Sequence, residues 1–351
     1  MATRNRPPFA TSFPRTLARY SGAVEAALRS AIPGGDIPLH RAMRYHMGWC
    51  DEGGAPVASA GGKRLRPILC LMTCKAVGGS ARQAMPAAAA LELVHNFSLV
   101  HDDVQDQDRE RHQRPTVWAL WGEPQALMVG NTLYALACKS VLGLAHHRIA
   151  TTLVLRSLER LVKSSLAMLE GQYLDLEFER RLDVTTQEYL DMIALKTGAL
   201  MSCAMELGCL IGSGDPAKVP PFARSGLFIG QLFQLRDDIL GIWGDSAFTG
   251  KAVYADLHRR KKTYPVIHAF QHASSVGAAT LRRVYQKDQL DGDDIRLVLE
   301  VLESTGACQE AQRQAASLAD QALESIRPAE LPPQSSRELE ELVFFLLYRE
   351  R

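Results

Sequence analysis

The densest group of reactive side chains is an acidic run that ends a long apolar stretch. Residues 95–108 read HNFSLVHDDVQDQD, which places Asp102 and Asp106 four residues apart. On a helical wheel these carboxylates lie within about 40° of each other, so they share one helix face. Carboxylates are unfavourable at a helix C-terminus, and local conflicts of this kind tend to mark function. Two acids at this spacing suit Mg²⁺, which binds a few carboxylates and keeps water or phosphate ligands.

A second acidic pair lies more than a hundred residues later in the chain. Residues 231–245 read QLFQLRDDILGIWGD, with Asp237 and Asp238 inside an amphipathic pattern and Gln234 one turn ahead. Alone, the first run is explained equally well as a solvated acidic helix end. Two such pairs, however, can face each other across a helical bundle, as carboxylates do in other helical metal sites. The sequence therefore predicts a site for several Mg²⁺ ions around one diphosphate, with the ligands Asp102, Asp106, Asp237 and Asp238.

Cations that suit phosphate groups gather at separate points. Residues 61–67 read GGKRLRP, so Lys63 and Arg66 lie one turn apart beside a glycine pair at a helix start. Backbone N–H groups and two cations there would suit a phosphate, although no P-loop or GxGxxG pattern is present. Each further basic group is by itself more typical of a solvated surface. These groups are Arg109, Arg111 and Arg114, Lys196 beside Thr197, and the basic residues between Lys251 and Lys262.

The elements that must position these residues are predicted to be helices. Apolar residues recur at i, i+3 and i+4 through long stretches, whereas β-branched alternation is scarce. Thr185 and Glu188 fit a capping box, and no repeat of 20 to 50 residues suggests a solenoid. We expect one large all-α antiparallel bundle around a central cavity rather than two domains. About fourteen helices are expected, at roughly 15–31, 37–48, 64–78, 84–107, 124–144, 149–180, 186–195, 197–211, 221–244, 255–272, 276–285, 292–303, 305–326 and 334–349.

Composition excludes several classes of protein. The chain has 351 residues, of which 46% are hydrophobic and 23% charged, as in a globular protein with a substantial core. The net charge of +1 argues against a nucleic-acid partner, which would require a one-signed field. The purely apolar runs fall short of the roughly 18 residues that cross a membrane, and no secretory signal is apparent. We therefore expect a cytoplasmic protein with no transmembrane segment, whose seven cysteines are reduced.

At these motifs the sequence resembles the trans-isoprenyl diphosphate synthases (the polyprenyl synthetase family), and most closely the bacterial geranylgeranyl and farnesyl diphosphate synthases. The resemblance runs from about Arg64 almost to the C-terminus. It implies an isoprenoid synthase fold, usually a homodimer, in a domain at 16–351 that follows a flexible tail at 1–15. Some members are cargo of encapsulin shells, which makes the tail a candidate docking segment. The ordered motifs are GGKRLRP, HNFSLVHDDVQD, RPTVW, GQYLDL at 171–176, KTG at 196–198, FQLRDDILG and GKAVYADLHRRKKTYP.

The resemblance also implies a role for individual residues. Asp102 and Asp106 would hold Mg²⁺ against an allylic diphosphate, and Asp237 would hold another ion from the opposite wall, with three ions in all. Lys196 would join these acids as a catalytic residue, because it stabilises the charge of the leaving diphosphate. The allylic diphosphate would contact Arg111, Lys196, Thr197, Gln234, Lys251 and Lys261. Isopentenyl diphosphate would contact Lys63, Arg66, His95 and His112.

The activity implied is a Mg²⁺-dependent prenyltransferase that condenses isopentenyl diphosphate head-to-tail with allylic diphosphates. A class I terpene cyclase is an alternative, but it has no second diphosphate to bind. A regulatory subunit of a prenyl synthase is another, and the intact DDxxD at 102–106 argues against it. Three departures from the family pattern leave room for weakened catalysis. These are His112 for a second arginine, Gly241 for the third acid of the second motif, with Asp245 one turn further on, and Asn131 for a usual aspartate.

Product length is predicted from the residues just before the first acidic run. Ser98 lies about 40° from Asp102 on the wheel, whereas Phe97 lies about 140° away, so the wheel itself predicts no floor. In the family, an aromatic at the position of Phe97 followed by a small residue accompanies C20 products, and two aromatics accompany C15. The first motif also lacks a two-residue insertion seen in many bacterial farnesyl synthases. We therefore expect Phe97 and Ser98 to form the floor, with a C20 product first and C15 second.

Overall fold

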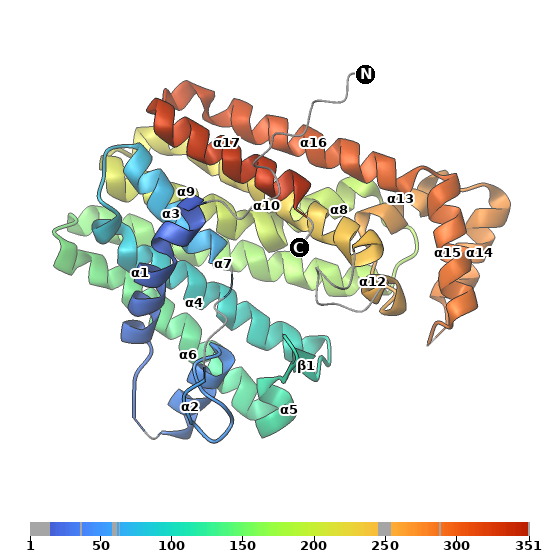
Figure 1. The fold of residues 1–351 in the computed structure, drawn as a ribbon, viewed down its shortest axis with the longest axis horizontal. Coiled ribbons are helices and arrows are strands. Elements are labelled where there is room, and N and C mark those ends of the chain that lie inside the picture. The colour runs from blue at the N-terminus through green and yellow to red at the C-terminus, as the bar shows by residue number, and fades with distance from the viewer. Residues whose placement is uncertain are drawn as a thin grey trace.

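The structure of the protein is a computed structural model, which describes residues 15–35, 37–57, 62, 64–244, 254–287 and 289–349. Helices dominate this part of the chain (Figure 1). Within it, β-structure is confined to an isolated bridge and a hairpin of two-residue strands, β1 (Glu110–Arg111) and β2 (Arg114–Pro115). The predicted all-α fold class is therefore confirmed.

Long helices form the centre of the bundle. They are α3 (Leu65–Ala76), α4 (Ala81–Gln105), α6 (Glu123–Leu142), α7 (Thr151–Glu179), α9 (Ala199–Ser213) and α10 (Val219–Trp243). The other α-helices are α1 (Arg15–Ala31), α2 (Pro38–His46), α5 (Val117–Trp121), α8 (Thr186–Ile193), α12 (Ala255–His258), α13 (Tyr264–His272), α14 (Ser275–Tyr285), α15 (Gly292–Ser304), α16 (Ala307–Ile326) and α17 (Pro333–Tyr348). Short 3₁₀ turns lie at η1 (Gly143–His147), η3 (Pro216–Lys218) and η4 (Arg327–Ala329), and a π-helical turn lies at η2 (Ala194–Gly198).

The core is built from the apolar faces of these helices. Helix α4 packs against α3, α6 and α9, and α10 packs against α9 and α16. Almost every α9 residue from Leu200 to Ile211 is buried, so this helix lies in the middle of the main apolar cluster. A second, smaller cluster lies among α13, α14 and α15, and the latter two stand at one end of the molecule (Figure 1).

Most predicted helices are present, but three local predictions differ from the structure. The single helix expected at 255–272 is wrong, because the chain divides into α12 and α13 around Arg260, whose φ of 54° is incompatible with a right-handed helix. The hairpin was missed, although His112 and Gln113 both adopt the positive φ that a tight two-residue turn requires. Helix α5 was also missed. The capping box of Thr185 and Glu188 is confirmed.

Two helical stretches, 123–147 and 186–213, are long and apolar enough to cross a membrane by composition. The sequence reasoning considered purely apolar runs and did not find them. The most apolar window of the stretch at 186–213 is 67% buried inside the bundle, whereas that of the stretch at 123–147 is only 33% buried. All seven cysteines are free, and five of them are buried. The predicted tail at 1–15 and the predicted site residues Lys63 and Lys251 lie, except for Arg15, outside the described residues, as does Asp245.

Candidate active site

One cavity of about 210 Å³ lies where α3, α4, α7, α10 and the π turn η2 meet. Both acidic segments reach its wall, through Asp102 on α4 and Asp237 on α10. The structure therefore brings together two sequence motifs that lie far apart in the chain. The residues lining the cavity are Arg66, His95, Phe97, Ser98, Leu99, His101, Asp102, Gln105, Met168, Leu169, Gln172, Lys196, Thr197, Phe233, Gln234 and Asp237.

The first acidic segment occupies the last turn of α4. Burial raises the pKa of Asp102 to about 6, and the neighbouring Asp106 adds to this rise while Lys196 opposes it. Asp106 follows the helix, and its Oδ2 lies 3.8 Å from Nζ of Lys261. Two carboxylates and two lysines thus gather around the C-terminal end of α4, which is an environment suited to a metal-bound anion.

Asp103, the middle acid of the first segment, has a different environment. Its side chain is buried, and Oδ1 lies 2.7 Å from both Nε and Nη2 of Arg111 in the hairpin. Arg111 was predicted to contact an allylic diphosphate, but here it pairs with Asp103 and does not line the cavity. The ion pair fixes the hairpin to the end of α4, so Asp103 supports the segment rather than facing the cavity.

The second acidic segment divides in the same way. Asp237 faces the cavity, and its Oδ1 lies 2.6 Å from Nη2 of Arg349. Asp238 is only 3% exposed, and its oxygens accept hydrogen bonds from the Tyr189 hydroxyl, the Tyr264 backbone N–H and the Gln234 amide. Burial raises the pKa of Asp238 to about 7. The oxygens of Asp238 are thus used within the protein, which argues against Asp238 as a metal ligand.

The π turn η2 presents Lys196 and Thr197 to the cavity. Lys196 forms an ion pair with Asp175 of α7, and burial opposes but does not outweigh the effect of Asp175 and Asp102 in raising the pKa of this lysine. The Thr197 hydroxyl donates to Oε1 of Gln234 at 2.9 Å. Isolated π turns inside helices are frequent at functional sites, because the extra residue redirects neighbouring side chains.

Glycines allow the backbones around this turn to approach closely. A Cβ atom at Gly171 of α7 would lie 2.2 Å from the backbone nitrogen of Lys196. One at Gly230 of α10 would lie 2.5 Å from Cα of Gly198. Any larger residue would push α7 or α10 away from the turn, so these glycines set the position of Lys196 and Thr197.

The residues predicted to bind isopentenyl diphosphate are only partly brought together. Arg66 and His95 both line the cavity. Burial, together with the charge of Arg66, holds the pKa of His95 well below its usual range, so the imidazole is neutral. His112 instead lies on the exposed turn of the hairpin and does not line the cavity. Asn131 is exposed on α6, also away from the lining residues.

The predicted floor residues lie in the cavity wall. Phe97 is buried and packs edge-on against His101, with ring centroids 4.8 Å apart. Its other neighbour is Tyr134 of α6, at 5.4 Å. The Ser98 hydroxyl donates to the backbone carbonyl of His95, so it leaves little bulk in the cavity. The side of the cavity toward α6 is therefore aromatic.

Gly241, which replaces the third acid of the second motif, has a neighbour that the sequence did not indicate. A Cβ atom at Gly241 would lie 1.8 Å from Oδ2 of Asp256. The carboxylate of Asp256 in α12 thus occupies the space that a side chain at position 241 would enter.

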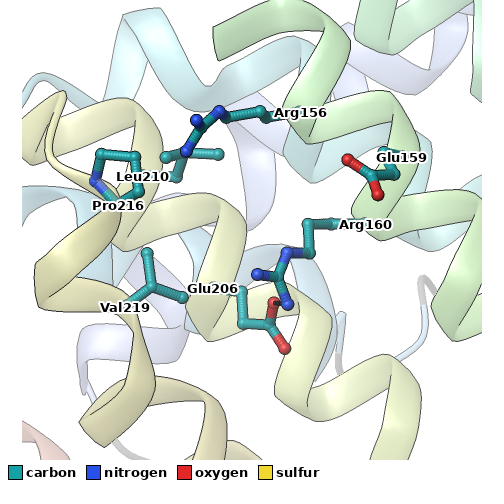
Figure 2. A pocket seen from close by; sticks show the side chains of 7 residues that line it. All are labelled: Arg156, Glu159, Arg160, Glu206, Leu210, Pro216 and Val219. Carbon is teal, nitrogen blue, oxygen red and sulfur yellow. Dashed lines mark ion pairs between the residues drawn. The ribbon is translucent and has the colours of Figure 1, made fainter.

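A second hollow, of about 190 Å³, lies among α7, α9 and α10 (Figure 2). Figure 2 shows Arg160 reaching toward Glu206, and the two side chains form an ion pair of 3.0 Å. Its lining includes no aspartate and no lysine, and it holds none of the predicted site residues. The carboxylate-lined cavity is therefore the better candidate for catalysis.

Sequence reasoning missed three charged residues at the site: Asp175, Asp256 and Arg349. Asp175 lies within the GQYLDL motif, so its position was a usable signal, but its partner Lys196 is 21 residues away. Arg349 is 112 residues from Asp237 and carried no motif.

The donor set fits Mg²⁺ only in combination with further ligands. Among the described residues, no three His, Cys, Asp or Glu side chains come close enough to hold a metal ion. The partly buried carboxylates of Asp102, Asp106 and Asp237 are hard oxygen donors, which Mg²⁺ prefers, and Mg²⁺ commonly completes its shell with waters and substrate phosphates. The arrangement thus suits a metal that binds together with an anionic substrate.

Known proteins share both the sequence and the fold. Residues 48–302 match the family model described as polyprenyl synthetase. A (2E,6E)-farnesyl diphosphate synthase of Mycobacterium tuberculosis is 36% identical over 318 residues, which cover 90% of this chain and 87% of the relative. A geranylgeranyl diphosphate synthase of that organism is 38% identical over 287 residues, covering 82% and 81%.

Solved structures agree with these relatives. A polyprenyl synthetase from Streptomyces coelicolor A3(2) superimposes with a TM-score of 0.89 at 32% identity, covering 95% of this chain and 98% of that one. A geranylgeranyl pyrophosphate synthetase from Pyrococcus horikoshii gives a TM-score of 0.85 at 33% identity, with the same coverage.

The helical bundle and its carboxylate-lined cavity define an all-α isoprenoid synthase fold. The chain belongs to the polyprenyl synthetase family, whose relatives identify the class of activity as that of short-chain trans-prenyltransferases. Their names favour this hypothesis over the terpene cyclase and the regulatory subunit.

Proposed function

We propose that the protein condenses isopentenyl diphosphate head-to-tail with allylic diphosphates and yields a C20 product, with C15 second. One observation carries this proposal: Asp102 and Asp237, from two distant motifs, line a single cavity together with cations and apolar side chains. The polyprenyl synthetase domain is proposed to span residues 16–351.

Asp102, Asp106 and Asp237 are the residues that would hold Mg²⁺, and we propose three ions per site. When bound, Mg²⁺ neutralises the charge that develops on a diphosphate leaving group. Asp238 is left out of this set because its oxygens bind Tyr189 and the Tyr264 N–H.

The cations around the first segment stabilise the departing diphosphate. Lys196 lies in the cavity wall, and Lys261 lies beside Asp106, so both can donate charge-assisted hydrogen bonds to phosphate oxygens. Thr197 and Gln234 hold each other in place and can add neutral hydrogen bonds. Arg111 and Lys251 stay predicted contacts of this diphosphate.

Apolar side chains keep water away from the allylic carbon. Phe97, Met168 and Phe233 all line the cavity beside the charged end. Since an allylic cation reacts with any nearby water, a dry wall is required for attack by the isopentenyl double bond. Arg66 and the neutral His95 would orient the isopentenyl diphosphate, together with the predicted contacts Lys63 and His112.

Incubation of the purified protein with Mg²⁺, isopentenyl diphosphate and each allylic starter tests the reaction. Formation of a longer all-trans prenyl diphosphate is the expected result. A cyclic hydrocarbon formed without isopentenyl diphosphate would indicate a terpene cyclase. No product from any starter, but stimulation of an added synthase, would indicate a regulatory subunit.

The product length follows from the aromatic side of the cavity. Phe97→Ala should lengthen the product and Ser98→Phe should shorten it, each by at least one five-carbon unit, because both residues line the cavity and the two changes remove and add bulk there. Phe270→Ala, which alters an aromatic packed against the smaller cluster, is a matched control and should leave the length unchanged. Fixed lengths in both cavity variants would place the floor elsewhere.

The protein is also proposed to act as a cytoplasmic homodimer, without a nucleic-acid partner. Large apolar side chains are exposed along two adjacent helices, and a face of this kind usually packs against a partner. A gel-filtration mass measurement tests this, and Leu166→Glu should shift a dimer toward monomer. The exposed side chains are Leu127, Met128 and Leu142 on α6 and Leu155, Leu166, Leu169 and Tyr173 on α7.

Docking of residues 1–15 to an encapsulin shell stays a prediction.

A further inference from the structure

The side chain of Arg349, just after α17, is held tightly against the second acidic segment. Its Nη2 donates to Oδ1 of Asp237 at 2.6 Å and to the carbonyl of Phe233 at 3.0 Å. The guanidinium also lies over the Phe233 ring, with Cζ 4.2 Å from the centroid. Arg349 is only 3% exposed, so this cation is withdrawn from solvent.

The backbone of Arg349 is fixed to the same helix. Its carbonyl accepts hydrogen bonds from Nε and Nη2 of Arg236, at 3.0 and 2.8 Å. Helix α17 itself is anchored by buried residues such as Leu342 and Leu346. The main chain can therefore stay docked on α10 while the arginine side chain changes partners.

This contact conflicts with a metal at Asp237. Within the described part of the chain, Arg349 forms an ion pair with no carboxylate other than Asp237, and its buried Nε has no hydrogen-bond partner. A divalent cation at Asp237 would compete with Arg349 and leave a buried guanidinium beside a second positive charge, which is strongly unfavourable. The conflict disappears when another anion reaches Arg349. A diphosphate is suited to this role, because its oxygens match the guanidinium fork.

We propose that Arg349 gates the second acidic segment: it holds Asp237 while the cavity carries no diphosphate, and it releases Asp237 to a divalent cation as it turns to a bound diphosphate. This rests on the proposed function, in which Asp237 is a metal ligand. In the first segment, the cavity lysine Lys196 pairs with Asp175 of α7 rather than with Asp102. Metal binding at Asp237 and diphosphate binding are therefore coupled through one side chain.

Mn²⁺ binding to the full-length protein, measured by electron paramagnetic resonance with and without inorganic pyrophosphate, tests the gate. Without pyrophosphate, Arg349→Gln should bind Mn²⁺ at one site about tenfold more tightly than the wild type, because its competitor is gone. Pyrophosphate should then enhance Mn²⁺ binding about tenfold less in the variant than in the wild type. Arg327→Gln removes an exposed arginine paired with Glu324 and should match the wild type.

Further variants separate the gate from a general loss of structure. Arg349→Met keeps an apolar stem over Phe233 and should also tighten Mn²⁺ binding, with melting temperatures recorded for each variant. In an Asp237→Ala background, Arg349→Gln should no longer change Mn²⁺ affinity. Equal Mn²⁺ affinities in the wild type, Arg349→Gln and Arg349→Met without pyrophosphate would overturn the proposal.

Two ligands identify which diphosphate Arg349 receives. Isopentenyl diphosphate alone and a non-reactive allylic thiolodiphosphate are each tested in place of pyrophosphate. The ligand that enhances Mn²⁺ binding less in Arg349→Gln than in the wild type is the one that Arg349 contacts. If Arg349→Gln reduces the enhancement of Mn²⁺ binding by neither ligand, the proposal that Arg349 moves to a bound diphosphate is wrong. Prenyl transfer is assayed separately, so an inactive protein that still shows the Mn²⁺ difference would refute the activity and retain the gate.

Discussion

Each acidic segment contains two adjacent aspartates with the same division of roles, but the residues that bind the buried aspartate differ between the two segments. In each, the first aspartate faces the cavity and the second is buried and bonded within the protein. Adjacent helical residues point about 100° apart, so a doubled aspartate supplies one cavity carboxylate and one structural carboxylate. A count of acids in the sequence therefore overstates the number of carboxylates that face the cavity.

The supports differ in burial and in origin. Asp103 pairs with Arg111, which is partly exposed on a two-stranded hairpin. Asp238 instead binds Tyr189 of α8 and the backbone of α13, deep in the bundle. The segments also differ at the third position, where Asp106 has Lys261 as a neighbour and Gly241 leaves room for Asp256. The second segment is thus the more firmly built into the core.

Removal of either cavity carboxylate tests the shared part of the comparison and should have the largest effect. Asp102→Ala and Asp237→Ala should each lower kcat by at least about a thousandfold, because a metal contact contributes several kcal/mol to the transition state. Steady-state assays at saturating Mg²⁺ measure this. Circular dichroism should show an intact fold, and Asp293→Ala on the surface is the control. Near wild-type activity in either variant would remove that residue from the metal set.

The cations beside the two segments should be separable by substrate. Arg66 lines the cavity and is acted on electrostatically by Asp237, and Arg66→Ala should raise the KM for isopentenyl diphosphate about ten- to a hundredfold, since charge-assisted hydrogen bonds contribute roughly 1.5–3 kcal/mol. The KM for the allylic substrate should change far less. Equal effects on both substrates would show that the two diphosphate sites are wrongly assigned. His112→Arg, which improves affinity only if His112 reaches this substrate, is the companion test.

Replacement of Asp238, the buried aspartate of the second segment, should change the stability of the protein rather than its metal binding. Asp238→Ala removes the acceptor for Tyr189, Gln234 and the Tyr264 N–H, which should cost about 1–3 kcal/mol of unfolding free energy. Asp238→Asn keeps one carbonyl oxygen and should lose less. Chemical denaturation measures both. An Asp238→Asn protein with normal stability but no turnover would return Asp238 to the metal ligands.

The stability of the protein should fall in acid because of a histidine at the end of α2. Burial, with a contribution from Arg111, lowers the pKa of His46 to about 3, while the neighbouring Asn96 amide opposes the shift. Below pH 6.5 the His46 imidazole binds a proton in the unfolded chain but not in the folded protein. Its contribution to the free energy of unfolding is therefore fully present above pH 6.5 and is lost as the pH decreases. His46 alone should lower the free energy of unfolding by about 2 kcal/mol between pH 6.5 and pH 5. His46→Gln should reduce that loss in urea titrations at both pH values, whereas exposed His146→Gln should not; an unchanged loss in His46→Gln would contradict the assignment.

The sequence predicts the regular parts of this molecule well, because helical periodicity and capping are local. Helix α1 and the capping box at Thr185 were predicted at their observed residues. Asp102, Lys196 and Asp237 could be assigned from motifs that each lie within a few neighbouring residues. The hydrogen bonds of Asp238 could not be predicted, because its partners, Tyr189 and Tyr264, come from α8 and α13, and no local pattern reports such contacts. Arg349 was missed for the same reason, since only the packing of α17 on α10 brings it to Asp237.

The close backbone contacts at Gly171, Gly198 and Gly230 have a consequence for how this enzyme can change. At these three positions the helices approach each other through main chain, so any added side chain displaces a helix. The cavity wall at Phe97, which packs against Tyr134 of α6, is instead formed by a side chain, and these rings can be exchanged for smaller or larger ones. A laboratory library aimed at new product lengths should therefore keep these three glycines unchanged and vary the side chains that line the cavity, with Phe97 first.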